Sequence, residues 1–244
     1  MDRRTDAPWP QDHGGDVYGP PSSSVARDFS ASINPLGCPE GVTAALLARW
    51  NEVLHYPDRR SARLRAAIAR RYEIDAERVL AGNGSAELID LSIRALGGTR
   101  VLLCPPDFGL YGAFRAAGVP LETVPRIEDQ GFAVDDALLA ARMEKGDLVL
   151  FSNPANPSGH ALDRERVLAL AERADKVGAT LLVDEAFADF APSCSVLDRA
   201  GNPPALAVLR SLTKFYGIPG VRLGFLAAAP EILSDLAVQG MARG

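Results

Sequence analysis

Residues 148–159 read LVLFSNPANPSG and indicate both the fold class and the place of the functional site. The first four residues are all apolar, as a strand buried on both faces of a parallel sheet requires. A polar, proline-rich loop follows directly. Because ligands of such sheets bind beyond the carboxyl ends of the strands, this loop lies where a ligand site is expected.

Strands and helices alternate on both sides of this stretch. Further short apolar strands are expected at residues 79–81, 101–104, 121–124, 180–183, 206–209 and 223–228. Helices are expected at residues 40–53, 61–72, 86–96, 109–117, 135–143 and 163–177, with Ser61, Asp135 and Asp163 as caps. This alternation predicts an α/β fold, a three-layer sandwich with a mainly parallel sheet. Residues 1–40 are expected to form an N-terminal arm and loop, and residues 41–244 the major domain.

Composition restricts the class of protein. The 244 residues are 47% hydrophobic and 23% charged, which is typical of a soluble globular protein, and the net charge of -5 argues against nucleic acid as the main partner. No apolar run approaches the roughly 20 residues that span a membrane, so no membrane partner is expected. Cys38, Cys104 and Cys194 lack metal-ligand spacing and are expected to be free thiols in a reducing cytoplasm. The three histidines share no ligand pattern, so no metal site is expected.

Residues 82–85 (GNGS) form a second loop that directly follows a predicted strand. Glycines at a strand-to-helix turn let backbone amides approach a phosphate, although the same residues could serve only as a helix cap. Glu87 stands where a dinucleotide-binding fingerprint needs its third glycine, and no Gly-Lys-Ser/Thr follows. Neither a nicotinamide Rossmann site nor a P-loop is therefore indicated.

Lys214 lies in a third such loop, residues 211–222 (SLTKFYGIPGVR). A lysine whose pKa is lowered by burial or by neighbouring cations can form a Schiff base with a carbonyl, whereas most loop lysines are simply solvated. Asp184 ends another buried strand, where a carboxylate could pair with a protonated ring nitrogen. Asn156 could donate to a phenolate oxygen. Tyr111 offers a ring face for stacking, although core packing is the commoner role of a tyrosine.

Together these motifs resemble those of fold-type-I pyridoxal-phosphate enzymes in the class I/II aminotransferase family, over nearly the whole chain from His13 onward. The motifs are Asn-Pro-x-Asn-Pro-Ser-Gly, Asp-Glu-Ala-Phe, and Ser-Leu-Thr-Lys followed by Arg222. The resemblance implies pyridoxal 5'-phosphate as cofactor, Lys214 as the Schiff-base lysine and Asp184 as the partner of the pyridine nitrogen. It implies as further cofactor contacts Asn156 on the 3-oxygen, Tyr111 stacked on the ring, and Gly84, Ser85, Ala86, Ser211, Thr213 and Arg222 around the phosphate.

The resemblance also implies partners. Tyr56 would reach the cofactor phosphate of a neighbouring subunit, which implies a homodimer. His13 and Asn34 would help to place a small phosphorylated amino-acid substrate. Relatives continue past the position of Gly244 into a small C-terminal domain that covers the site, so the chain is expected to be truncated.

Within the family, residues 13–15 (HGG), 34–37 (NPLG) and 184–187 (DEAF) are most similar to threonine-phosphate decarboxylases. This similarity implies decarboxylation of L-threonine O-3-phosphate to (R)-1-aminopropan-2-yl phosphate in cobalamin biosynthesis. Many histidinol-phosphate aminotransferases have a tyrosine where Phe187 stands. An aminotransferase of that type is the first alternative, and a non-catalytic remnant that only binds the cofactor or a partner is the second.

Overall fold

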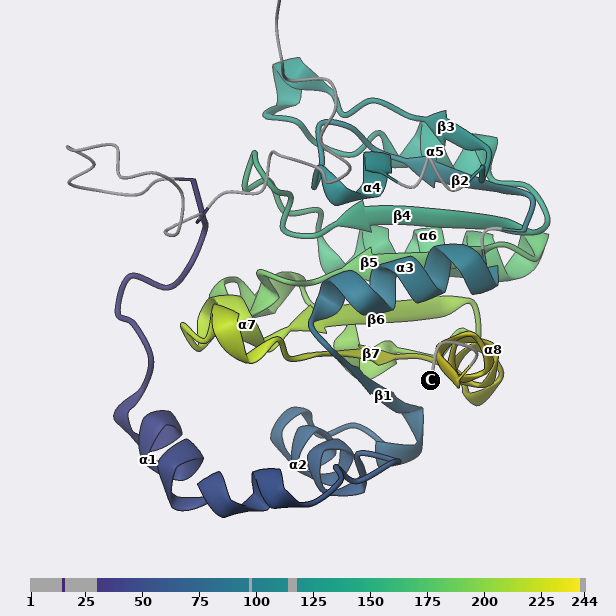
Figure 1. The fold of residues 1–244 in the computed structure, drawn as a ribbon. Helices are drawn as coiled ribbons and strands as arrows, with labels where there is room; N and C mark the ends of the chain where they lie inside the picture. The colour runs from purple at the N-terminus through teal and green to yellow at the C-terminus, as the bar shows by residue number, and fades with distance from the viewer. Residues whose placement is uncertain (1–14, 16–29, 97, 114–117, 242–244) are drawn as a thin grey trace, which may run out of the picture.

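A seven-stranded sheet of order β1-β7-β6-β5-β4-β2-β3 lies at the centre of the computed structural model, which describes residues 15, 30–96, 98–113 and 118–241 (Figure 1). The strands are β1 (Val79–Gly82), β2 (Arg100–Leu103), β3 (Leu121–Thr123), β4 (Asp147–Ser152), β5 (Thr180–Asp184), β6 (Leu206–Ser211) and β7 (Gly224–Ala227). Strand β7 pairs antiparallel with β1 and β6, and the other pairs are parallel. The predicted mainly parallel sheet and its seven strands are confirmed.

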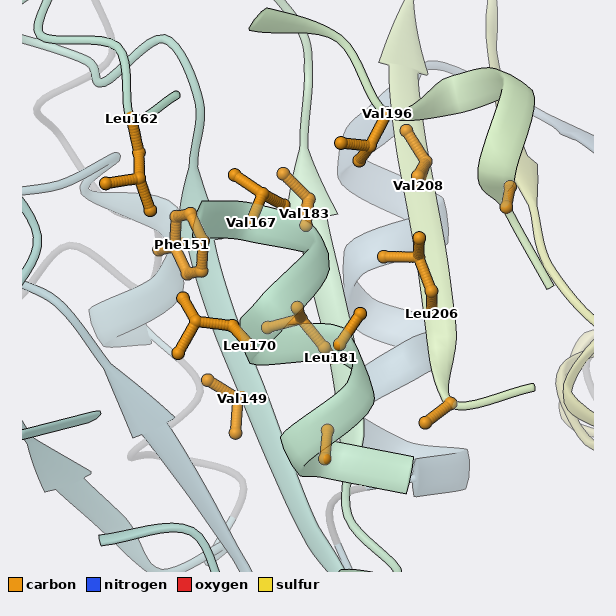
Figure 2. Close-up of a cluster of buried hydrophobic side chains, with 14 of the residues drawn as sticks. Val149, Phe151, Leu162, Val167, Leu170, Leu181, Val183, Val196, Leu206 and Val208 are labelled. Carbon is orange, nitrogen blue, oxygen red and sulfur yellow. The ribbon is translucent and has the colours of Figure 1, made fainter. Parts of the chain in front are cut away.

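Helices cover both faces of the sheet. Helices α3 (Ser85–Leu96) and α8 (Pro230–Met241) pack on one face, and α2 (Ala62–Tyr72), α5 (Asp136–Arg142) and α6 (Arg164–Val177) pack on the other (Figure 1). Figure 2 shows Val167 and Leu170 of α6 lying against Val149, Phe151 and Leu181 of the sheet. The three-layer sandwich is confirmed. Both layers of helices pack against side chains of the same strands.

The central strands are buried along their whole length. All six residues of β4 and all six of β6 are buried. Alternate side chains of β4 enter opposite cores, since Val149 and Phe151 pack with α6 while Leu148 and Leu150 pack with α3. A strand that is covered on both faces has no solvated side, which explains the unbroken apolar run at residues 148–151.

Helix starts agree only in part with the expected caps. Asp135 accepts a hydrogen bond from the Leu138 N–H at 2.9 Å, as expected. Ser61 is not a cap, because its backbone is left-handed (φ 47°) and its side chain makes no capping bond. Asp58 replaces it and accepts from the Ala62 N–H at 2.6 Å. Asp163 occupies the N-cap position of α6 as expected, but its side chain makes no capping bond.

The described residues before α2, residues 15 and 30–61, include no buried side chain. The expected helix at residues 40–53 divides into α1 (Glu40–Ala48) and the 3-10 helix η1 (Trp50–Leu54), and neither contains a buried residue. Figure 1 shows α1 at the end of an extended segment, away from the sheet. The packing of the domain therefore begins at α2, where Ile68 enters the core.

Short helices complete the chain. They are α4 (Leu110–Ala113), α7 (Leu212–Phe215), η2 (Ala76–Arg78), η4 (Glu128–Gln130), η5 (Ala188–Phe190), η6 (Pro192–Cys194), η7 (Leu197–Arg199) and η8 (Pro219–Val221). The end of the helix expected at residues 109–117 lies outside the described residues. No helix in the described part of the chain has the length and apolar character that crossing a membrane requires. All three cysteines are free, as expected.

Candidate active site

The carboxyl ends of β4, β5 and β6 bring the expected site residues to one edge of the sheet. Ser152 at the end of β4 is the register partner of Asp184 at the end of β5, which in turn pairs with Leu209 of β6. Lys214 follows β6 on the short helix α7 rather than in the loop that the sequence indicated (Figure 1). A helix fixes the lysine backbone more firmly than a loop would.

The Lys214 amine is half-buried and faces charges of both signs. Burial lowers its pKa, the Arg222 guanidinium lowers it further, and the Asp184 carboxylate opposes both effects. A lowered pKa increases the neutral fraction of the amine, which is the form that attacks a carbonyl. These surroundings therefore favour a lysine that can form a Schiff base.

Asp184 is a buried carboxylate with two hydrogen bonds. The residue is only 3% exposed. Its carboxylate accepts a hydrogen bond from the Tyr111 hydroxyl at 2.6 Å and another from the Ala186 N–H at 3.0 Å. Burial raises the pKa of Asp184 to about 6, although both hydrogen bonds act in the opposite direction. A carboxyl in this state gains from a cationic ligand, because the ligand's charge offsets the cost of burial.

The structure places Tyr111 differently from the sequence expectation. Its ring is buried, 2% exposed, so it presents no open face on which a cofactor could stack. Phe108, three residues earlier, is less buried and lies edge-on to Tyr111 with 5.6 Å between ring centroids. Phe108 was missed by the sequence analysis, although it belongs to the same short motif, residues 105–111.

The turn between β1 and α3 lies close to the Arg222 side chain. Gly84 has a left-handed backbone (φ 80°), and a Cβ at this position would lie 2.6 Å from Arg222 Nη2. Glu87 accepts a hydrogen bond from the Asn83 N–H at 2.6 Å, so the helix supplies its own cap. The close approach of Gly84 and Arg222 therefore favours a phosphate-binding turn over a glycine-rich cap alone.

Two buried hydroxyls complete this corner of the site. The Ser211 and Thr213 oxygens are 2.8 Å apart, and both residues are buried. Gly224 is the register partner of Ser211, and a Cβ on it would lie 2.7 Å from the Ser85 N atom. Ser85 and Ala86, the first two residues of α3, therefore lie beside the strand ends that carry the hydroxyls.

A buried polar network supports the loop that contains Asn156. The Asn156 N–H donates to Ser152 Oγ at 3.1 Å, and Ser152 donates through both its N–H and its hydroxyl to Asp107. Asp107 also pairs with Arg126 at 2.8 Å, with both side chains almost completely buried. This network was missed, because no local signal in the sequence joins residues 107, 126 and 152.

Of three further expected residues, Asn34 lies beside α7, Tyr56 lies away from this edge and His13 lies outside the described residues. Tyr56 is fully exposed and is not part of the site within this chain. Asn34 donates through Nδ2 to the Phe215 carbonyl at 2.8 Å and accepts from the Leu36 N–H, so its side chain anchors its loop on α7.

The donor set at this edge fits pyridoxal 5'-phosphate. A half-buried amine suits the aldehyde, a buried carboxylate suits a protonated ring nitrogen, and a glycine turn beside Arg222 suits a phosphate. Residues 27–242 match the family model of aminotransferase class I and II, and the chain belongs to this family of pyridoxal-phosphate enzymes.

Named relatives include enzymes of two activities. The chain is 38% identical over 206 residues to threonine-phosphate decarboxylase of Salmonella typhimurium and 37% identical over 216 residues to histidinol-phosphate aminotransferase of Roseiflexus castenholzii. These alignments cover 84% and 85% of this chain but 57% of each relative. The crystal structure of histidinol-phosphate aminotransferase from Clostridium acetobutylicum superposes with a TM-score of 0.77 at 27% identity, covering 86% of this chain and 63% of that one.

Proposed function

We propose that this chain is the cofactor-binding part of a threonine-phosphate decarboxylase. In this proposal residues 41–244 form the major domain of the enzyme, whereas most of the arm and loop expected at residues 1–40 lies outside the described residues. The meeting of Lys214, Asp184 and Arg222 at one edge of the sheet is the strongest support for a pyridoxal-phosphate enzyme, and Phe187 is the residue that favours the decarboxylase within that class. The substrate would be L-threonine O-3-phosphate and the product (R)-1-aminopropan-2-yl phosphate, a step of cobalamin biosynthesis in the cytoplasm.

The proposal assigns each side chain a task. Lys214 would hold the cofactor covalently, and Asp184 would keep the ring nitrogen protonated. Asn156 would donate to the 3-oxygen, and Phe108 rather than Tyr111 would offer its ring to the cofactor. The phosphate would be bound by Gly84, Ser85, Ala86, Ser211, Thr213 and Arg222. When bound, the cofactor supplies an electron sink that stabilises negative charge at the substrate α-carbon.

Chemical trapping tests the role of Lys214. The chain contains only three lysines, Lys145, Lys176 and Lys214, so the site of attachment can be assigned unambiguously. Borohydride treatment of the protein with pyridoxal 5'-phosphate should fix the cofactor on the peptide that contains Lys214. Lys145→Arg and Lys176→Arg are matched controls that should leave labelling unchanged, whereas Lys214→Arg should abolish it. Label on Lys145 or Lys176 instead would contradict the assignment.

The reaction type depends on which α-carbon bond the enzyme breaks, and Lys214, Asp184 and Asn156 serve either reaction. Phe187 supports the decarboxylase, because it lacks the hydroxyl that many histidinol-phosphate aminotransferases carry there. The aminotransferase remains the second candidate, since relatives of both activities match this chain at similar identity.

An assay with both substrates separates the candidates. Carbon dioxide released from L-threonine O-3-phosphate without 2-oxoglutarate supports the decarboxylase. Glutamate formed from 2-oxoglutarate and histidinol phosphate, without gas, supports the aminotransferase. Cofactor binding without any spectral change on adding either amino compound would indicate a non-catalytic remnant.

The exposed apolar side chains of α1 and η1 support a homodimer. Leu47, Trp50 and Leu54 are 71%, 68% and 79% exposed, and Tyr56 follows them. Apolar side chains gathered on one segment indicate a surface that another molecule covers. In the proposal a second copy covers it, and Tyr56 enters that copy's site. Trp50→Glu should then shift the mass measured by analytical ultracentrifugation from dimer to monomer, while Arg94→Glu on the exposed face of α3 should not.

A further inference from the structure

Tyr111 makes the shortest side-chain contact to Asp184 among those that the structure describes, and nothing in the proposed function so far uses it. The hydroxyl donates to Asp184 Oδ2 at 2.6 Å, and both residues are buried. Burial raises the pKa of the Tyr111 phenol well above its ordinary value, so the hydroxyl stays protonated and remains a donor. The contact is therefore a charge-assisted hydrogen bond, which is stronger than one between neutral groups.

We propose that Tyr111 is a positioning residue whose hydroxyl orients the Asp184 carboxylate and keeps it ionised for a cationic ring nitrogen. This inference rests on the proposed role of Asp184. An ionised carboxylate has about four lone-pair sites. Tyr111 and the Ala186 N–H occupy two of them, so acceptor capacity for a ring N–H remains.

The groups that face Asp184 explain why such a donor matters. Asp107, from the loop after β2, and Glu185, the next residue of the chain, are acidic and raise the pKa of Asp184, in addition to the effect of burial. Both acids have their own arginine, because Asp107 pairs with Arg126 and Glu185 with Arg210. Lys214 is the nearby cation, since the Asp184 carboxylate raises the pKa of its amine.

Asp184 itself forms no ion pair with an arginine in the described part of the chain. Its charge is therefore supported by the Tyr111 hydroxyl and the Ala186 N–H, with Lys214 nearby. If Lys214 holds the cofactor covalently, its amine no longer provides a constant positive charge near Asp184. The Tyr111 hydroxyl then becomes the side-chain donor that persists.

The test is a titration of the Asp184 carboxyl in the protein without cofactor. Carbon-13 NMR of aspartate-labelled protein follows the carboxyl, and Asp184→Asn identifies its signal. Tyr111→Phe removes one oxygen and keeps the ring, so we expect the titration midpoint to rise by about one pH unit. Tyr72→Phe is the matched control, because the Tyr72 hydroxyl also faces a carboxylate, that of Asp189, at 3.3 Å. It should leave the Asp184 midpoint unchanged.

A second probe remains usable if Tyr111→Phe does not fold. Replacement of tyrosine by 3-fluorotyrosine keeps the hydroxyl and makes it a stronger donor, so the Asp184 midpoint should fall. An Asp184 midpoint that responds to neither change would overturn the inference.

Cofactor binding distinguishes this inference from the proposed function. In protein loaded with pyridoxal 5'-phosphate, Tyr111→Phe should shift the pH midpoint of the cofactor absorbance, while Tyr72→Phe should not. An unchanged absorbance midpoint in a loaded Tyr111→Phe variant would refute the role of Tyr111 alone. Failure of the wild-type chain to bind the cofactor would instead refute the proposed function, and the titration without cofactor would still decide whether Tyr111 holds Asp184.

Discussion

Asp184 and Glu185 are neighbours in the chain, both are carboxylates, and both are buried, yet their surroundings differ. Asp184 lies on the face of the sheet that α3 covers and accepts from one hydroxyl and one backbone N–H. Glu185 accepts from the Ser195 hydroxyl and the Val196 N–H, and its Oε2 lies 3.0 Å from the Arg210 Nε atom. Glu185 therefore has an arginine among its partners, whereas Asp184 forms no ion pair with an arginine within the part of the chain that the structure describes.

Arg210 extends the set of partners around Glu185. Its guanidinium lies 3.1 Å from Asp189 and stacks over the Tyr72 ring at 5.3 Å. Burial raises the pKa of Glu185, and Arg210 is the strongest opposing influence. A buried acid with an internal cation serves the fold, and a buried acid without one is suited to a cationic ligand. Because both residues are buried, burial alone does not distinguish the roles of Asp184 and Glu185.

The largest expected effect is on stability at Glu185. Glu185→Gln keeps the shape of the side chain but removes the charge that faces Arg210. Breaking a buried ion pair from one side costs about 3–5 kcal/mol, so the free energy of unfolding in urea should fall by about that amount. Glu144→Gln on the exposed surface is the control and should change little. A loss below about 1 kcal/mol would show that the ion pair with Asp189 alone compensates the buried charge of Arg210.

The second effect is the pH dependence of stability that comes from Asp184. Its pKa in the folded protein, about 6, exceeds the usual 3.8, so the folded chain binds a proton more readily than the unfolded chain. The stabilisation from this protonation is complete below 3.8 and is lost as pH rises through 6. Without cofactor, Asp184→Asn should therefore be more stable than wild type at pH 7.5, on the order of 3 kcal/mol, and nearly equal to it at pH 4.

Urea unfolding at a series of pH values measures that difference. A difference that stays constant from pH 4 to pH 7.5 would mean that Asp184 does not titrate in this range. Opposite signs for Asp184→Asn and Glu185→Gln at neutral pH would be the sharpest evidence that the two acids have different tasks.

The third effect concerns cofactor affinity. Asp184→Asn removes the negative charge that would face the protonated ring nitrogen, and a hydrogen bond to a charged group contributes about 1.5–3 kcal/mol. The dissociation constant for pyridoxal 5'-phosphate, followed by absorbance, should increase by roughly tenfold to a hundredfold. Affinity equal to that of wild type would refute the proposed contact between Asp184 and the ring.

The smallest effect is expected at Ser195. Its hydroxyl donates to Glu185 at 2.7 Å and accepts from Arg210 at 2.8 Å. Ser195→Ala removes one partner from each and leaves the ion pair, so the free energy of unfolding should fall by about 1 kcal/mol. Cofactor affinity should be unchanged. A change in affinity without a change in stability would place Ser195, and with it Glu185, in the ligand site after all.

The strands were predictable because each is a short apolar run bounded by polar or glycine-containing segments. The edge at which their loops meet followed from the parallel topology that the runs implied. The sequence alone therefore places Lys214 and Asp184 together. The start of α2 was also predictable, but its capping side chain was not, because Asp58 rather than Ser61 accepts from the Ala62 N–H.

The partners of the buried charges were not predictable. Glu185 and Arg210 are 25 residues apart in the chain, and only the pairing of β5 with β6 brings them together. The same holds for Tyr111 and Asp184, which are separated by 73 residues. A motif identifies a residue type at a position, but the direction of a ring or a hydroxyl depends on packing between distant segments. This is why Tyr111 was expected to stack and is found as a donor.

The antiparallel strand β7 has a consequence for how this chain can vary in length. Because β7 runs against β6, the connection from Ser211 to Gly224 leaves the sheet and returns to it at the same edge (Figure 1). The Leu212 N–H donates to the Leu223 carbonyl at 3.1 Å and closes the base of this connection. Lys214 and Arg222 lie within the closed segment. Substitutions inside it change chemistry at fixed spacing, whereas a single-residue insertion or deletion would displace the amine and the guanidinium relative to each other.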